Sequence, residues 1–369
     1  GFEFADYKLL ASTYDVEATV LAAIEFDKKI CQINGVICIA SDVPLTVATV
    51  ATKLNLPSIT IESAKLAIDK FAMKKRFERD KVPIPWFSSV DSYDHLKKLV
   101  KSNKFQFVIK PFDSRGSRGV LRIKEDTNLE WVYKNAKKNS PTNRVMLEQF
   151  LEGPQVSTES LVVNKVAYTP GFSDRNYEFL DTYEPYIIEN GGQLPSHLDK
   201  NIQKAVHDLI QKASISMGID NGVVKGDIVI NNGKPYVIEL AARLSGGYFC
   251  THEIPLNTGV DLVGAAILQS LGERIDTNNL KPKFNRPVAQ RYLFPKPGKV
   301  NSVTLPKWAS SDPDISLLEV RVNKGDTIEP VTNHPARAGV VITTGSEISN
   351  AINKAESVIS SIEIIMEPH

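Results

Sequence analysis

Residues 224–240 constrain the fold more than any other stretch, because they combine a tight-turn signal with two strand-forming flanks. The Asn-Asn-Gly motif that ends at Gly233 predicts the turn, and Pro235 belongs beside it because proline cannot donate to a ladder. A register symmetric about Gly233 places Asp227 opposite Glu239. The same register predicts an apolar face on the other side of the hairpin, formed by Ile228, Ile230, Tyr236, Ile238 and Leu240.

The two acidic side chains of this hairpin predict a metal site. Asp227 and Glu239 repel each other on one sheet face, so a positive charge is expected between them. Mg²⁺ is typically held by one or two carboxylates together with phosphate oxygens and water. The alternative is a solvent-exposed pair whose repulsion is weakened by water. Arg243 follows closely and precedes a Ser-Gly-Gly loop around Gly246, whose backbone can approach a ligand.

A second stretch, residues 105–120, predicts a strand that delivers Lys110 to a loop rich in serine, glycine and arginine. Small residues allow backbone N–H groups to turn toward phosphate oxygens, and Lys110, Arg115 and Arg118 can supply positive charge. Glycine-rich hairpin loops also occur without any ligand. The sequence has neither G-x-G-x-x-G after a strand nor G-x-x-x-x-G-K-[ST], which excludes dinucleotide-binding and P-loop sites of those types.

Two further stretches contain candidate binding groups. Residues 144–159 predict a strand, a short connector and another strand, where exposed backbone groups could read the edge of a planar base; alone, the segment would pass for a plain loop. A helix is predicted from about Ser63, its N-cap, to Asp80. Its basic residues indicate a solvated face: Lys70, Lys74, Lys75 and Arg76.

The chain is predicted to fold as an α/β protein with α+β modules, in three parts. Residues 1–62 alternate helix, buried strand and helix (16–29, 35–40 and 48–54), and this unit is expected to be cut from a longer chain because it lacks a first strand of its own. Residues 63–275 form the central part, with a small subdomain at about 82–147, and residues 276–369 form a C-terminal α+β domain. The other expected elements are strands at 105–109, 120–123, 145–148 and 156–163, and helices at 129–138, 198–217, 260–271 and 346–360.

Composition excludes several classes of protein. Lys plus Arg number 44 and Asp plus Glu 43, so the net charge of +1 gives no general attraction for nucleic acid. Three cysteines, Cys31, Cys38 and Cys250, without C-x-x-C spacing argue against a disulfide framework or a structural zinc site and favour a cytoplasmic protein. No apolar run approaches the roughly 20 residues needed to span a bilayer, so no membrane partner is expected.

The order of these pieces resembles the ATP-grasp superfamily. The following pieces succeed one another over residues 20–365: a helix lysine, a Lys-Pro pair with a Ser/Gly loop, the motif Glu-x-Phe-Leu-Glu-Gly-Pro, and an Asp and a Glu twelve residues apart, of which the Glu begins the motif Glu-x-x-x-Arg. The stretch 331–345 is similar to the C-terminal domain of the branch that includes amino-acid ligases and biotin-carboxylase-like proteins. The resemblance implies an ATP-grasp fold and ATP with Mg²⁺ (or Mn²⁺) as cofactors, and it suggests a homodimer, since relatives of this branch are often dimers.

The resemblance also implies roles for individual residues. Asp227 and Glu239 would hold Mg²⁺, while Arg243 and the backbone of Gly246 would neutralise charge on an acyl phosphate and the transferred phosphoryl group. Glu148 would accept a hydrogen bond from the adenine amino group, and the loop 114–119 would close over the phosphates as a lid. The implied nucleotide-binding residues are Lys70, Lys110, Ser114, Gly116, Ser117, Gly119, Glu148, Gln149, Phe150, Leu151 and Gln155.

Candidate substrate residues follow from the same comparison and from side-chain chemistry. Glu189 matches a position that often binds a substrate ammonium in amino-acid ligases. Arg291 and Arg337 are the expected anchors for a substrate carboxylate, because an arginine can bind it with two parallel hydrogen bonds. His252 and His334 could assist proton transfer, although isolated histidines beside turns are more often structural.

The chain departs from the family pattern at several positions. Ala241 replaces the usual Asn two residues after the second metal carboxylate, which removes one metal ligand. Gly247 replaces the acidic residue that biotin carboxylases use as a base, which argues against biotin carboxylation. Gly192 stands where amino-acid ligases often have histidine, Arg115 replaces a small residue, and Gln155 replaces a frequent Glu.

The sequence therefore predicts an ATP- and Mg²⁺-dependent ligase that activates a small carboxylate as an acyl phosphate for attack by an amine. The partners would be small molecules, with neither nucleic acid nor membrane involved. Two alternatives stay open: a non-catalytic ATP-binding module, which Ala241 favours, and an enzyme that phosphorylates a carboxylate or bicarbonate for another reaction.

Overall fold

The computed structural model describes residues 2–367. The strands are β1 (Phe87–Val90), β2 (Phe107–Pro111), β3 (Leu121–Ile123), β4 (Val145–Gln149), β5 (Gln155–Val163), β6 (Val166–Arg175), β7 (Gly192–Leu194), β8 (Gly222–Asn231), β9 (Lys234–Ala241), β10 (Val288–Leu293), β11 (Gly298–Thr304), β12 (Ile315–Val320), β13 (Thr327–Ile328), β14 (Gly339–Thr344) and β15 (Glu363–Met366). The α-helices are α1 (Val16–Lys29), α2 (Pro44–Lys53), α3 (Ile61–Ile68), α4 (Lys70–Arg79), α5 (Tyr93–Ser102), α6 (Leu129–Lys138), α7 (Lys200–Ser216), α8 (Ile254–Thr258), α9 (Leu262–Ser270) and α10 (Ile348–Ser360).

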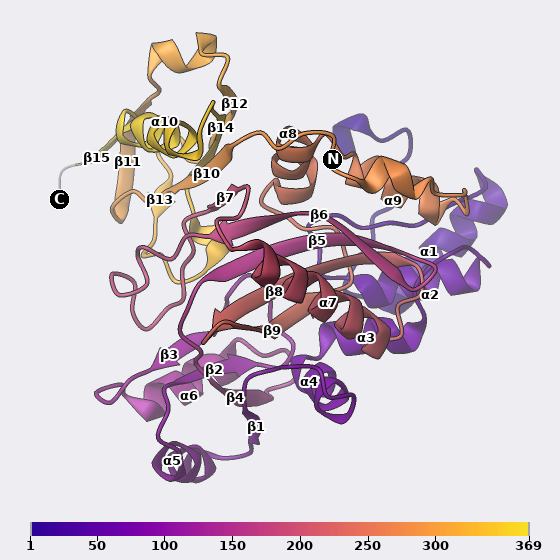
Figure 1. Cartoon of the computed structure of the whole chain (residues 1–369), viewed down its shortest axis with the longest axis horizontal. Helices are drawn as coiled ribbons and strands as arrows, with labels where there is room; N and C mark the ends of the chain where they lie inside the picture. The colour runs from indigo at the N-terminus through magenta and orange to yellow at the C-terminus, as the bar shows by residue number, and fades with distance from the viewer. Residues whose placement is uncertain (1, 368–369) are drawn as a thin grey trace.

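The residues that the structure describes form three sheets (Figure 1). The central sheet has eight strands in the order β12-β14-β10-β7-β6-β5-β8-β9, and it runs without a break across the predicted domain boundary near residue 275. A four-stranded sheet, β1-β4-β2-β3, lies below it in Figure 1, and a three-stranded sheet, β13-β11-β15, lies near the C-terminus. The predicted α/β fold is confirmed, whereas the domain limits stay a prediction.

Helices cover these sheets with apolar side chains. Leu209 and Ile210 of α7 pack on one face of the central sheet against Val237 and Leu240, whereas α8 and α9 pack around Leu161 on the other face. Helices α5 and α6 cover the four-stranded sheet. The sequence did not predict α5. None of the helices between residues 2 and 367 has the length and apolar character that a membrane span requires.

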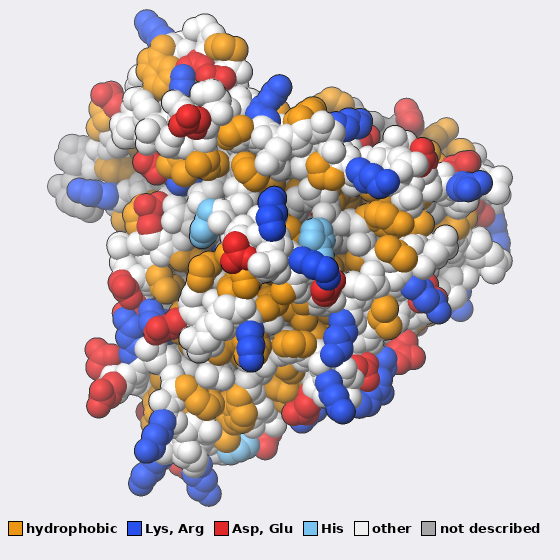
Figure 2. All heavy atoms as spheres, viewed as in Figure 1, with side chains coloured by type: hydrophobic (Ala, Val, Ile, Leu, Met, Phe, Trp, Pro, Cys, Tyr) orange, Lys and Arg blue, Asp and Glu red, His pale blue; other side chains and the backbone are white. Residues whose placement is uncertain are grey.

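The surface in Figure 2 carries charges of both signs. Lys and Arg side chains alternate with Asp and Glu over this face, and no large area of it has a single sign. This distribution agrees with the net charge of +1 and offers nucleic acid no extended basic surface on the face shown.

The predicted strand at 35–40 does not form. Within this segment Ile39 makes one isolated parallel bridge with Leu244, and no described strand runs alongside the remainder. Ile37 and Ile39 are 37% and 38% exposed, so the prediction of a buried strand was wrong. An apolar run of this kind becomes a strand only when neighbouring strands satisfy its backbone groups. The flanking helix α1 forms at the predicted residues, α2 begins at Pro44 instead of at residue 48, and the two helices share a small core.

The predicted single helix at 63–80 is in fact two helices, α3 and α4. Thr60, not Ser63, caps α3, and its side chain accepts a hydrogen bond from the Ser63 N–H at 3.0 Å. Asp69 has extended backbone angles, ends α3 and caps α4 by accepting from the Ala72 N–H at 2.8 Å. This break places Lys70 in the first turn of α4, with its N–H bound to the carbonyl of Phe112 at 2.9 Å.

The hairpin β8–β9 places Asp227 opposite Glu239, as predicted, but the turn and the strand register differ from those expected. Its turn consists of Asn232 and Gly233, both with positive φ (50° and 72°), which suits the type I′ turn of tight hairpins. This turn alone would pair Asp227 with Ile238. A β-bulge at Ile238 shifts the register by one residue and brings Glu239 opposite Asp227.

The same bulge overturns part of the predicted apolar face. Ile228, Ile230 and Leu240 belong to the core as expected. Val237 takes the core position predicted for Ile238, and Ile238 instead lines the cleft described below. Tyr236 neighbours Val237 in the strand and lies on the other face of the hairpin, because side chains alternate along a strand.

We predict that Asp69→Ala lowers the free energy of unfolding by about 1 kcal/mol, because it removes the N-cap of α4. Urea denaturation measures this change. Asp69→Asn is the matched control, since asparagine caps a helix nearly as well, and it should lose at most a few tenths of a kcal/mol. Equal losses in both variants would contradict a capping role.

Candidate functional site

A cleft of about 590 Å³ separates the central sheet from the four-stranded sheet. It is lined by strands β2 and β4 on one side and by β8 and β9 on the other, together with parts of the N- and C-terminal regions. The structure brings most of the predicted site residues to this one cleft: Lys70, Lys110, Ser114, Gly116, Ser117, Glu148, Gln149, Phe150, Leu151, Gln155, Glu189, Asp227, Glu239, Arg243, Gly246 and Arg337.

Two predicted residues do not line the cleft. Gly119 has φ of +71° and packs against the end of α6, where an added Cβ would lie 2.7 Å from the Cβ of Asn139. Arg291 is on β10 between Gln290 and Tyr292, which do line the cleft, so its side chain faces the other side of the sheet. Its guanidinium donates to the Gln290 carbonyl at 2.9 Å and lies near α10. Arg291 is therefore in the wrong place to anchor a substrate in this cleft.

A buried carboxylate with two lysines lies at the base of the cleft. Glu148 is 2.5 Å from the Nζ of Lys74 and 2.7 Å from that of Lys110, and all three side chains are less than 5% exposed. Burial would raise the pKa of Glu148, but the two ammonium groups outweigh it and hold that pKa below its usual range. Burial lowers the pKa of Lys74 to about 8 despite Glu148. The prediction of a solvated Lys74 was wrong.

Asp227 and Glu239 face the cleft with 32% and 33% of their side chains exposed. Burial would raise the pKa of Asp227, but Lys225 and Arg175 lower it well below its usual range, so the group is ionised. The Nζ of Lys70 lies 3.1 Å from Oε1 of Glu239. Two carboxyl groups with oxygens open to the cleft are a donor set that fits a hard divalent cation such as Mg²⁺.

The loop 114–119 is held over the cleft by contacts from distant parts of the chain. Lys70 donates to the Ser114 carbonyl at 2.6 Å, and the N–H of His334 donates to the Gly116 carbonyl at 3.1 Å. Arg115 donates to the Asp42 carbonyl at 3.2 Å, which joins the loop to the N-terminal region. The loop thus bridges the N- and C-terminal regions and covers the cleft. Sequence reasoning did not find these partners because they lie far away along the chain.

Arg243 and the following loop form another wall of the cleft. The Nε of Arg243 donates to Oδ1 of Asp42 at 2.6 Å. The backbone N–H of Ser245 donates to Glu159 at 2.9 Å, and its hydroxyl also bonds that carboxylate. Glu159 is fully buried, and burial raises its pKa to about 7, although the bonds from Ser245 oppose the shift. Glu159 therefore fixes the backbone next to Gly246.

The far end of the cleft is lined by arginines, acids and aromatic rings. Glu189 lies 2.9 Å from Arg175 and 3.0 Å from Arg337, whose guanidinium stacks 3.5 Å above the ring of Tyr292. Glu253 is buried nearby, and burial, with the charge of Glu189 adding to it, raises its pKa to about 8. Glu189 and Arg337 are thus brought together as one ion-paired cluster rather than as separate anchors.

Of the two histidines considered, only His334 lines the cleft. Burial lowers its pKa well below the usual range, so the imidazole is neutral. His252 lies outside and packs edge-on against the ring of Tyr248. The cleft residues that the sequence analysis did not predict include Asp42, Lys225, Glu253 and Tyr292.

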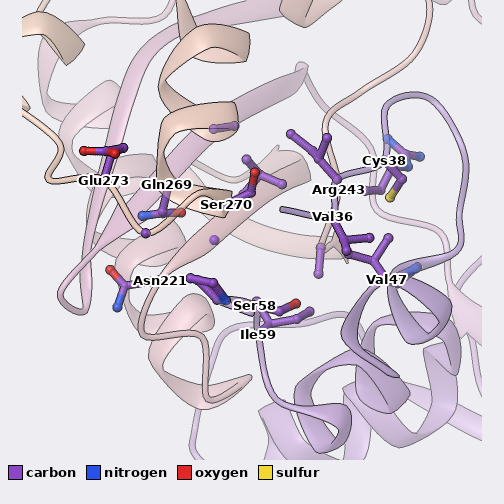
Figure 3. A pocket seen from close by; sticks show the side chains of 18 residues that line it. Val36, Cys38, Val47, Ser58, Ile59, Asn221, Arg243, Gln269, Ser270 and Glu273 are labelled. Atoms are coloured by element: carbon purple, nitrogen blue, oxygen red, sulfur yellow. The ribbon is translucent and has the colours of Figure 1, made fainter. Parts of the chain in front are cut away.

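A second cavity, of about 440 Å³, lies between the N-terminal region and α9 (Figure 3). Its wall is mainly apolar, and Arg243 and Glu273 are its charged residues. Burial raises the pKa of Cys38 in this wall to about 11, so its thiol stays protonated. Because cations do not converge here, the cavity lacks the charge that a polyphosphate requires.

Comparisons with known proteins agree with this geometry. An ATP-grasp domain model matches residues 67–247, and the model of L-amino acid ligase C-terminal domain 2 matches residues 291–367. The uncharacterized protein y4rH of Sinorhizobium fredii is 24% identical over 349 residues, which cover 91% of this chain and 69% of that protein.

Solved structures share the fold at low sequence identity. An L-amino acid ligase from Bacillus licheniformis has a TM-score of 0.81 at 17% identity, over 96% of this chain and 86% of that one. A phosphoribosylglycinamide synthetase from Anaerococcus prevotii has a TM-score of 0.75 at 17% identity, over 99% of this chain and 90% of that one. The ATP-grasp fold implied by the sequence is confirmed.

We predict that Glu159→Gln stabilises the protein at pH 8 but has little effect near pH 4.5. A carboxyl whose pKa is about 7 when folded and 4.5 when unfolded takes up a proton on folding, so its burial costs stability as the pH rises from 4.5 to 7. At about 1.4 kcal/mol per pKa unit, the substitution should raise the free energy of unfolding at pH 8 by at most about 3 kcal/mol. Urea denaturation at both pH values measures it.

The control for Glu159→Gln is Glu125→Gln, which changes an exposed carboxylate. It should leave stability within about 0.5 kcal/mol at both pH values. A gain for Glu159→Gln that is the same at pH 4.5 and pH 8 would show that the carboxyl is not protonated in the folded protein.

Proposed function

We propose that the chain, in which residues 67–247 match an ATP-grasp domain, is an ATP- and Mg²⁺-dependent ligase that joins a small carboxylate to an amine. The observation that carries this proposal is the position of Asp227 and Glu239 in the same cleft as Lys70, Lys110 and the loop 114–119. Such a cleft can hold a polyphosphate between basic side chains and a divalent cation. Mn²⁺ can replace Mg²⁺ in a site made of carboxylate oxygens.

The segment after β4 supports binding of a purine base. The N–H groups of Gln149 and Phe150 donate to the carbonyls of Trp86 and Gln106, both at 2.8 Å. The N–H of Leu151 donates to no described residue, and Leu151 lines the cleft. In this segment, the backbone N–H of Leu151 is therefore available to donate a hydrogen bond to the edge of an adenine ring. Glu148 is held by two lysines, and we assign it to positioning Lys110 as well as to the predicted contact with the adenine amino group.

The chemistry needs an activated carboxylate, because an oxide is a poor leaving group. A carboxylate oxygen attacks the γ-phosphorus of ATP and ADP leaves; the amine then attacks the acyl carbon and phosphate leaves. A divalent cation held by Asp227 and Glu239 would stabilise the negative charge of the phosphates. Lys70, Lys110 and Arg243 offset the negative charge that remains, and the loop 114–119 excludes water that would hydrolyse the acyl phosphate.

The far end of the cleft is the proposed position of the carboxylate and the amine. Arg175 and Arg337 can hold a carboxylate group, and Glu189 between them can hold an ammonium group. These charges of both signs favour a zwitterionic substrate such as an amino acid. The aromatic faces of Tyr177 and Tyr292 complete this end of the cleft.

A non-catalytic ATP-binding module is the second candidate, and Ala241 favours it. Ala241 lines the cleft on the same strand as Glu239 and offers no ligand atom. Such a module would bind ATP and Mg²⁺ without turnover. A carboxylase-type reaction has less support, because Gly247 supplies no base.

The decisive experiment is an assay of phosphate and ADP release with ATP, Mg²⁺ and a library of amino acids tested singly and in pairs. The ligase proposal predicts release that depends on a particular carboxylate and amine together. Release with one carboxylate alone, with an acyl phosphate that hydroxylamine traps, would favour a carboxylate-phosphorylating enzyme. Tight ATP binding without any release would favour the non-catalytic module.

We predict that Glu239→Gln lowers the stimulated rate by at least 100-fold, because one of the two cation ligands loses its charge. Lys234→Gln is the matched control: it changes an exposed residue at the turn end of the same strand and should retain the rate within twofold. Measured kcat values decide the outcome. A Glu239→Gln enzyme with unchanged kcat would remove this carboxylate from the mechanism.

A further inference from the structure

We propose that Lys225 acts as a built-in cation beside the metal site, so that the protein binds one divalent ion per nucleotide instead of two. Phosphoryl-transfer sites use either one or two such ions, and fixed ammonium groups can offset the same phosphate charge. The inference rests on the proposed function, since it specifies how the ATP-binding cleft is neutralised. It assigns to Lys225 a role that neither the motifs nor the fold implies.

The contacts of Asp227 support this assignment. Lys225 forms an ion pair with Oδ1 of Asp227, Ser157 donates to the same oxygen at 2.9 Å, and Arg175 lies 3.6 Å from it. The other oxygen, Oδ2, accepts no hydrogen bond from residues 2–367. One oxygen of Asp227 is therefore committed to side chains of the protein, while the other is available to an external cation.

Glu239 has a matching arrangement. Its Oε1 lies 3.1 Å from the ammonium of Lys70, and Glu239 accepts no hydrogen bond from any residue that the structure describes. Each of the two facing acids is thus paired with one lysine and retains an oxygen open to the cleft. Two open oxygens from opposite strands can hold one divalent ion between them, with phosphate oxygens and water completing its shell.

The position of Lys225 in the sheet explains why a second divalent ion cannot bind beside the two acids. Lys225 pairs with Ala241 in the hairpin register, so the ammonium and the methyl group lie on neighbouring strands beside the acids. The methyl group of Ala241 cannot bind a metal. The side chain of Lys225 is only 12% exposed, and its ammonium forms an ion pair with Asp227, where it would repel a second cation.

Among residues 2–367, each of the other acids that line the cleft already has a partner in the protein. Glu148 is paired with two lysines, Glu189 with two arginines and Asp42 with Arg243, while the buried Glu253 accepts a hydrogen bond from Ser173 at 3.4 Å. Within residues 2–367, no cluster of three or more His, Cys, Asp or Glu side chains is arranged to hold a metal ion. The donors present suffice for one ion that also uses nucleotide oxygens.

The test counts Mn²⁺ ions bound per molecule of a non-hydrolysable ATP analogue, AMP-PNP, by equilibrium dialysis and electron paramagnetic resonance of the full chain. The wild type should bind one Mn²⁺ per bound AMP-PNP. Lys225→Gln/Ala241→Asn should bind two, because the repelling charge is gone and a ligand is added. Ala241→Asn alone should still bind one, since the ammonium remains.

A second measurement isolates Lys225 without nucleotide. The Kd for Mn²⁺ alone should fall at least threefold in Lys225→Gln, because Oδ1 of Asp227 is released, and should stay unchanged in Lys234→Gln. Circular dichroism should confirm that each variant is folded. Two Mn²⁺ per AMP-PNP in the wild type, or one in a folded double variant, would overturn the inference while leaving the ligase proposal intact. Failure of the wild type to bind AMP-PNP would overturn both.

Discussion

The opposition of Asp227 and Glu239 is the constraint on which the rest of the site depends. Like charges on facing strands are unfavourable, and the two-residue turn at Asn232 and Gly233 would keep them out of register. The bulge at Ile238 restores the opposition and turns both acids toward the cleft. A local distortion that brings two repelling groups together is understandable where a bound cation compensates for it.

The opposite wall of the cleft depends on a second electrostatic arrangement. Lys74, Lys110 and Glu148 are buried together, and burying any one of them alone would be costly. As a set they hold the ammonium of Lys110 at the base of the cleft, while the break at Asp69 places Lys70 at its edge. The two walls meet through the pair formed by Lys70 and Glu239.

The sequence correctly predicted several helices and strands whose formation depends on residues close together along the chain. The strand before Lys110 and helix α6 were correct because strand and helix periodicity determine them. The facing acids were predicted correctly, but the bulge at Ile238 and not the turn brings them opposite each other. The strand at 35–40 was wrong because an apolar run needs partner strands that this segment lacks. The single helix at 63–80 was wrong because Asp69 favours a cap over helix continuation, and helical periodicity does not show that preference.

Much of the site could not be predicted because it depends on long-range packing. Whether Arg291 or its neighbours face the cleft is decided by the register of β10 in the sheet, which the sequence does not specify. Lys74 was predicted to be exposed to solvent. This prediction was wrong because Lys74 pairs with Glu148, which lies on another element far along the chain. Lys225 was overlooked since its importance arises from its cross-strand neighbours, Asp227 and Ala241.

The most direct test of the central claim is a crystal structure of the protein with AMP-PNP and Mn²⁺, in which anomalous scattering locates the metal. We expect a single manganese peak between the side chains at positions 227 and 239, with the adenine edge against the backbone of residue 151. A nucleotide bound elsewhere, or a peak remote from both acids, would contradict it.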